Sequence, residues 1–135
     1  MPASGGEPVR FCDKASYGAA VSPDSKFVAF WIKEPDDKKW RVAITNSNDG
    51  RIVNYLPIPQ TNSIKWLPDG SGVSYILTAD GVSNIWTQPI RSGQPIQETR
   101  FTSDTLDNFD WSPDGELVCS RTARVRDAFL IRNFR

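Results

Sequence analysis

The sequence predicts an all-β protein built from propeller blades of four antiparallel strands, with three blades in the chain. A short phrase ending in Pro-Asp occurs three times, and its aspartates, Asp24, Asp69 and Asp114, are spaced 45 residues apart. The chain of 135 residues therefore holds three periods of a length typical of a four-stranded blade. Aromatic and β-branched runs between turn signals fill each period, so short strands and no helix longer than a turn are expected.

The first predicted blade covers residues 18–58. Pro23 and Asp24 favour a tight turn between its first two strands, because proline presets φ and aspartate bonds to its own backbone. The charged segment 34–39 has mixed signs and is predicted to be the solvated loop between the second and third strands. The four strands, a to d, are predicted at 19–22, 26–32, 40–45 and 51–56.

The second and third predicted blades, 62–103 and 107–135, repeat this plan. In the second, Asp80-Gly81 is a two-residue hairpin signal between strands b and c. In the third, strand d is missing. The predicted strands are 64–66, 73–77, 83–87 and 96–101 in the second blade and 109–111, 116–120 and 128–131 in the third.

The missing strand is predicted at the start of the chain, in residues 6–13. The segment Pro8–Asp13 matches strand d segments such as 96–101, and a short loop leads from it into the next strand a. The order is then d, abcd, abcd, abc, the staggered arrangement by which a propeller ring covers its last open sheet edge.

Several of these segments resemble the WD40-like repeats of TolB-type β-propellers. The resemblance is carried by Ala20-Val21-Ser22-Pro23-Asp24, Ser83-Asn84-Ile85-Trp86-Thr87-Gln88-Pro89 and Phe109-Asp110-Trp111-Ser112-Pro113-Asp114-Gly115. The ending Leu130-Ile131-Arg132-Asn133-Phe134-Arg135 is similar to the last strand of propellers that terminate some bacterial serine/threonine kinases and winged-helix regulators.

The resemblance implies a non-catalytic module for protein interaction or sensing, since TolB-type propellers receive extended segments of partner proteins at the central opening. Those propellers have about six blades, and three blades cannot close a ring because closed rings hold ~4–8. A homodimer that forms a six-bladed ring is therefore expected, with residues 8–13 of one chain pairing with 128–134 of the other. The alternative is a larger enzyme, such as a kinase or peptidase, of which this chain is a truncated accessory propeller.

The candidate partner-binding residues lie on or just before strand a of the second and third blades. Lys65 and Asp110 occupy the same repeat position and have opposite charge; they are expected to form an inter-blade ion pair, a solvated channel wall, or a polar collar for a threaded peptide. Trp66 and Trp111, one residue later, are predicted to pack between blades. The complete predicted collar is Asn62, Ser63, Lys65, Asp107, Asn108 and Asp110.

Composition argues against other classes of function. Sixteen basic and sixteen acidic residues give no net charge. The basic strip Arg121, Arg124 and Arg126, predicted in the loop between strands b and c of the third blade, lacks interleaved aromatics, so nucleic acid is not an expected partner. Histidine is absent, which removes the commonest general base and metal ligand; no enzyme activity, cofactor or metal is expected.

The two cysteines, Cys12 and Cys119, are predicted to be reduced, because strand c would separate their strands and place their backbones roughly 9–10 Å apart. No segment of the sequence has the length of apolar residues that a membrane-spanning helix needs. The compartment is left open, although the family resemblance indicates an extracytoplasmic location if the chain belongs to a longer protein.

Overall fold

The computed structural model describes residues 14–61, 63–122 and 126–131, the last of these for the backbone only, and it is all-β. The prediction of an all-β fold is confirmed. In chain order the strands are β1 (Ala15–Val21), β2 (Phe27–Lys33), β3 (Arg41–Asn46), β4 (Ile52–Leu56), β5 (Ile64–Trp66), β6 (Gly72–Ala79), β7 (Val82–Pro89), β8 (Ile96–Gln97), β9 (Thr105–Trp111), β10 (Leu117–Thr122) and β11 (Arg126–Ile131).

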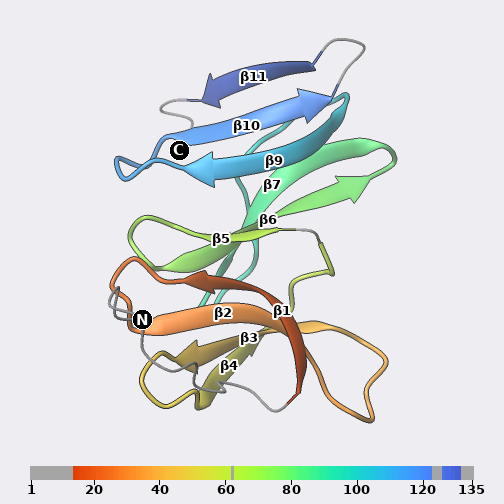
Figure 1. Ribbon diagram of the computed structural model, residues 1–135. Helices are drawn as coiled ribbons and strands as arrows, with labels where there is room; N and C mark the ends of the chain where they lie inside the picture. The colour runs from red at the N-terminus through yellow and green to blue at the C-terminus, as the bar shows by residue number, and fades with distance from the viewer. Residues whose placement is uncertain (1–13, 62, 123–125, 132–135) are drawn as a thin grey trace.

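The strands form three antiparallel sheets, and the second sheet lies between the first and the third (Figure 1). The first sheet has the order β1-β2-β3-β4 and the second β5-β6-β7-β8, which is the strand order expected of two blades. The third sheet has the order β11-β10-β9 among the described residues. The predicted closing strand at 6–13, including Cys12, lies outside them.

Each sheet meets its neighbour along its first strand. β1 contacts β5, and β5 contacts β9; the second and third sheets also meet through β6, β7 and β9. Because the three Pro-Asp turns directly follow β1, β5 and β9, this arrangement gathers the repeated phrases along one side of the stack.

The three Pro-Asp turns share one backbone feature at the residue after the aspartate. Ser25, Gly70 and Gly115, each directly after the repeated aspartate, have φ of 62°, 74° and 84°, in the left-handed region. Asp80 and Gly81 also have positive φ, 51° and 77°, and join β6 to β7 as the predicted two-residue hairpin.

Most of the core lies in the two layers between sheets, and a smaller cluster of Phe30, Ile32 and Ala43 lies on the outward face of the first sheet. Between the first and second sheets, Trp31 and Ile44 pack against Trp66 and Tyr75. The layer between the second and third sheets contains Ile85, Leu106, Phe109, Trp111, Leu117 and Cys119. Both tryptophans of the repeat position are at most 9% exposed, so their predicted packing between blades is confirmed.

Candidate functional site

The first strand of each sheet ends at a turn that its own side chains hold. In the first repeat, the Asp24 carboxylate accepts hydrogen bonds from the Ser22 hydroxyl at 2.6 Å and the Lys26 backbone N–H at 3.0 Å. Both bonds lower the pKa of the Asp24 carboxyl below its ordinary value of 3.8, and the bond from the Ser22 hydroxyl has the larger effect. In the second repeat, the Asp69 carboxylate accepts from the Ser71 N–H and hydroxyl. The aspartates therefore act in the turns, as the sequence predicts.

These turns and the strand ends before them surround a hollow of about 380 Å³ on the side of the stack where β1, β5 and β9 meet. We call it the channel hollow. It is lined by equivalent positions from all three repeats: Ala20, Val21 and Pro23; Lys65, Trp66 and Pro68; and Asp110, Trp111, Ser112 and Pro113. The hollow thus has prolines and aromatic edges as its apolar lining and one side chain of each charge.

Lys65 and Asp110 are neighbours around the channel hollow, but they do not form an ion pair. Within the described residues, no hydrogen bond or ion pair engages the half-buried Lys65 ammonium group. One oxygen of the exposed Asp110 carboxylate accepts the Trp111 backbone N–H at 2.8 Å. Of the three expected roles for this pair, an inter-blade ion pair is therefore wrong.

A second, smaller hollow of about 210 Å³ adjoins the first strands of the third sheet. We call it the third-sheet hollow. Asn108 joins Lys65 and Asp110 here, so the structure brings three of the predicted collar residues together. Its lining residues are Lys65, Asn108, Phe109, Asp110, Val118, Cys119 and Ser120.

The other predicted collar residues are not in these hollows. The exposed Asp107 carboxylate accepts a hydrogen bond from the Thr122 hydroxyl of the adjacent strand β10. Half-buried Ser63 accepts the Thr61 hydroxyl through its carbonyl oxygen at 3.1 Å. Asn62 lies outside the described residues.

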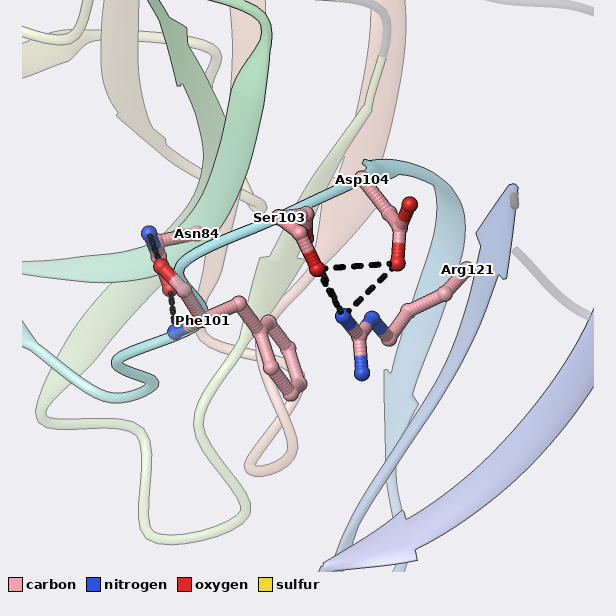
Figure 2. Close-up of polar contacts among 5 residues, drawn as sticks. All are labelled: Asn84, Phe101, Ser103, Asp104 and Arg121. Atoms are coloured by element: carbon pink, nitrogen blue, oxygen red, sulfur yellow. Dashed lines mark hydrogen bonds and ion pairs between the residues drawn. The ribbon is translucent and has the colours of Figure 1, made fainter.

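The connection between the second and third sheets is held by two side chains that the sequence did not single out for this purpose (Figure 2). Asn84 on β7 receives the Phe101 N–H at 2.7 Å and donates to the Phe101 carbonyl at 3.2 Å. Arg121 on β10 donates to the Ser103 carbonyl at 3.0 Å and to the Asp104 carboxylate at 2.9 Å. Its guanidinium also lies 4.3 Å from the centre of the Phe101 ring.

These contacts change the interpretation of the predicted basic strip. Arg121 lies on a strand rather than in a loop, and its charge is directed at the connection before β9. Arg126 begins β11, and Arg124 lies outside the described residues. The strip is therefore not a continuous basic loop.

The charged loop 34–39 is also partly tied to the sheet. Glu34 accepts hydrogen bonds from the Lys14 ammonium and, at 3.2 Å, from the Tyr55 hydroxyl. The Lys14 bond is the main cause of the lowered pKa of Glu34. Asp36 and Lys38, by contrast, are exposed within this loop.

A buried polar chain links the channel hollow to the outer part of the second sheet. The Trp111 indole N–H donates to the Ser74 hydroxyl at 3.0 Å, and Ser74 shares a hydrogen bond of 2.7 Å with Thr87. Thr87 donates to the Glu98 carboxylate at 2.8 Å. Sequence reasoning missed this chain, because only the fold brings β6, β7, β9 and the residue after β8 together.

Within the described ranges, no three histidine, cysteine or acidic side chains gather as metal ligands. A helix that could cross a membrane is likewise not found in that part of the chain.

Comparison with solved structures identifies the architecture. A protein from Agrobacterium tumefaciens assigned as TolB superposes with a TM-score of 0.73 at 19% sequence identity, over 90% of this chain and 44% of its own. The fold is that of a TolB-type propeller. TolB from Acinetobacter baumannii gives a TM-score of 0.60 at 15% identity, over 87% of this chain and 29% of its own. No protein-family model matches the sequence, and no curated protein matches it at a significant level.

The TolB-type part of the predicted resemblance is thereby confirmed at the level of fold. The resemblance to propellers of kinases and winged-helix regulators receives no support from these matches. This chain spans less than half the length of either TolB chain. The number of blades in a complete ring therefore stays a prediction.

Proposed function

We propose that this chain is a non-catalytic propeller module that binds an extended segment of a partner protein in the channel hollow. The observation that carries the proposal is the lining of this hollow by equivalent positions of three repeats, with Lys65 and Asp110 not paired to each other. A surface built in this way presents the same features at intervals, which suits an extended chain more than a compact small molecule.

The apolar lining supplies the first part of the proposed binding. Pro23, Pro68 and Pro113 offer rigid apolar edges, and Trp66 and Trp111 reach the hollow from the core layers. Aromatic side chains of this kind provide much of the binding energy at protein interfaces, because they bury a large area with little loss of conformational freedom.

The two charges supply the proposed orientation. An acidic side chain or a terminal carboxylate of the partner would pair with Lys65, and a basic side chain with the free oxygen of Asp110. Charge-assisted hydrogen bonds of this type are stronger than neutral ones and set the register of a bound segment. Asn108 is proposed to add an amide contact from the adjoining third-sheet hollow. Of the other collar residues, Ser63 and Asp107 are proposed to border the partner's path, and Asn62 remains part of the proposal.

We also propose that the functional ring contains two copies of the chain. The third sheet has three described strands, and β11 has a described neighbour only in β10. Ala15 begins β1 in the first sheet, which the second sheet separates from the third (Figure 1). Stacked sheets lie ~10 Å apart, so the start of β1 is roughly 20 Å from the third sheet of its own chain. Residues 8–13 would then complete the third sheet of the other copy.

Peptide selection tests the binding proposal. Short random peptides displayed on phage are selected on the immobilised 135-residue chain, and the dissociation constant of a recovered peptide is measured by calorimetry. Lys65→Ala and Asp110→Ala are each expected to weaken binding by about tenfold, which corresponds to ~1.4 kcal/mol. Lys38→Ala and Asp36→Ala, which remove the same charges from the exposed loop 34–39, should leave it unchanged. Equal effects of both pairs, or no recovered peptide, would contradict the proposal.

A further inference from the structure

The two internal junctions between sheets are built in the same way. At the first, Trp66 of β5 packs on the first sheet, and its indole N–H donates to the Ala20 carbonyl at 2.8 Å. Ala20 pairs across the ladder with the fully buried Ala29. At the second, Trp111 of β9 packs on the second sheet, and its indole N–H donates to Ser74, the ladder partner of Lys65. In both cases a large side chain of one sheet covers a small residue of the preceding sheet.

The two outer sheets of the described stack carry the two halves of a third such junction. Val21 occupies the position of Trp66 and Trp111 in the first repeat, and it is 60% exposed, the largest fraction among the exposed large hydrophobic residues described. Val118 pairs with Asp110 as Ala29 pairs with Ala20, so it occupies the position of the small residue on the third sheet. It is 41% exposed and lines the third-sheet hollow.

The sizes of these end residues match each other. Where the covering residue is tryptophan, the covered residue is alanine or serine; where the covering residue is the smaller Val21, the covered position holds the larger Val118. Close-packed interfaces keep their total volume when one side grows and the other shrinks. A foreign blade with a tryptophan at this position would be too large for Val118, whereas Val21 of an identical chain fits.

We propose that a second copy of this chain docks on the exposed part of β10 at the border of the third-sheet hollow, with Val21 of each copy covering Val118 of the other. This inference rests on the proposed ring of two copies and identifies its contact. Within the described stack the same chain cannot make this contact with itself, because Val21 lies on the first sheet and Val118 on the third, with the second sheet between them (Figure 1), and three sheets are too few to close a ring. Two copies joined head to tail form a closed, two-fold assembly.

Most of the first sheet's outward face is already buried, and the proposed contact uses its open end. Phe30, Ile32 and Ala43 on that face are at most 5% exposed. Val21 is the last residue of β1, at the edge of this face that borders the channel hollow. The two junctions of the ring would therefore adjoin the proposed peptide site and complete its wall.

A size exchange tests the contact. Light scattering gives the mass of the full chain over a concentration series, and the wild type is expected to reach two copies. Val21→Trp overfills the junction and should raise the dissociation constant of the dimer by about tenfold or more. Val21→Trp combined with Val118→Ala recreates the tryptophan-alanine pairing of the first junction and should restore association. Val53→Trp, on the exposed part of β4, is the control and should change nothing.

A cross-linking measurement supports the inference independently of these substitutions. In a Cys12→Ser background, Val21→Cys and Val118→Cys chains are mixed with a short bifunctional thiol reagent; a linked dimer is expected from the mixture and not from a mixture of Val53→Cys and Val118→Cys. A wild type that has the mass of one chain at every concentration, a double variant without recovery, or a Val21→Cys and Val118→Cys mixture that gives no linked dimer would overturn the inference. If the monomer still binds the selected peptide through Lys65 and Asp110, the proposed function stands and only this inference fails.

Discussion

Trp66 and Trp111 occupy the same repeat position, but their indole N–H groups have different hydrogen-bond acceptors. Both indole N–H groups are bonded at the inter-sheet layers, one to a backbone carbonyl and one to the Ser74 hydroxyl. Trp31 lies in the same core, but its indole nitrogen is buried and has no hydrogen-bond partner among the residues that the structure describes. The repeat pattern predicts where a large side chain is buried; the polar partner depends on residues that only the fold brings close.

Of the two cysteines, Cys119 is the one in the described part of the chain, and its environment leads to a prediction about its reactivity. Burial raises the pKa of the Cys119 thiol above its ordinary value of 9.0, and the Arg121 guanidinium offsets part of the rise. Because the folded state holds the proton more tightly, the stability associated with this group is complete below the ordinary pKa and is lost as the pH rises toward the raised one. Cys119 is also 2% exposed, so access to the thiol is restricted.

We therefore expect Cys119 to react slowly with a disulfide reagent in the native protein and rapidly once it is unfolded. A Cys12→Ser variant isolates this thiol, and absorbance at a series of denaturant concentrations measures the rate. A native rate equal to that of the unfolded chain would show that Cys119 is accessible.

At the scale of elements, the sequence predicts the existence and order of the strands better than their ends. β1 begins at Ala15 rather than at 19, because a bulge between Tyr17 and Ala20 accommodates Gly18 at φ 69°. A glycine inside a strand pattern weakens the strand signal, which hides such an extension. β9 likewise begins at Thr105 rather than 109.

The outer strand of the second sheet shows the opposite error. Residues 96–101 are predicted as one strand, but β8 ends at Gln97. After it, the Glu98 and Thr99 N–H groups both point to the Ile85 carbonyl, and the Asn84 side chain takes over the hydrogen bonds of the backbone. When a side chain replaces the neighbouring strand as the hydrogen-bond partner of the backbone, no periodic pattern in the sequence indicates it.

The close pairing of β6 and β7 gives an element-level prediction. A Cβ at Gly72 would lie 2.7 Å from the Thr87 methyl group and 3.0 Å from the Gln88 carbonyl oxygen. Gly72→Ala should therefore lower the free energy of unfolding by about 1–3 kcal/mol, since the backbone oxygen cannot move aside without disturbing the ladder. Urea denaturation measures the change.

Gly81→Asn is the matched control for that substitution. Gly81 has a positive φ that asparagine tolerates, and nothing lies within 4 Å of its added Cβ. We expect this variant to stay within about 0.5 kcal/mol of the wild type. A Gly72→Ala variant as stable as Gly81→Asn would mean that β6 and β7 are not so closely apposed.

The junction before β9 gives a second prediction at this scale. Arg121→Ala removes the contacts to Ser103, Asp104 and the Phe101 ring, and the Arg121 side chain is only 19% exposed. Because solvent weakens an ion pair to the partly exposed Asp104 carboxylate, we expect the free energy of unfolding to fall by only about 1–2 kcal/mol. Arg100→Ala, whose guanidinium makes a long hydrogen bond of 3.4 Å to Gln97, should cost about 0.5 kcal/mol or less.

A double-mutant cycle separates the ion pair from the ring contact. Asp104 has a φ of 73°, and Asn is tolerated there, so Asp104→Asn removes the charge without straining the backbone. Thermal denaturation of the single and double variants should give a coupling energy of about 0.5–1 kcal/mol. Strictly additive losses would assign the Arg121 effect to its contacts with Ser103 and the Phe101 ring.

At the scale of the whole molecule, the 45-residue period predicts both the three sheets and the place where their repeated phrases meet. Lys65, Asn108 and Asp110 could be selected from the sequence because repeat-equivalent residues share a position around the stack. The positions of Ser63 and Asp107 outside the two hollows could not be predicted in the same way, since their hydrogen bonds to neighbouring residues depend on local loop geometry. The repeat also predicts that Lys65 and Asp110 are neighbours, but it does not predict whether they form an ion pair, because that depends on the directions of the two side chains.

Hydrogen–deuterium exchange with and without the selected peptide tests most directly whether the three repeats build one binding surface. Protection gained on binding is expected in three segments spaced by the repeat, residues 20–23, 65–68 and 110–113, which together line the channel hollow. The exposed loop 34–39 should be unchanged. Protection confined to that loop, or to one repeat only, would show that the three repeats do not form one binding surface.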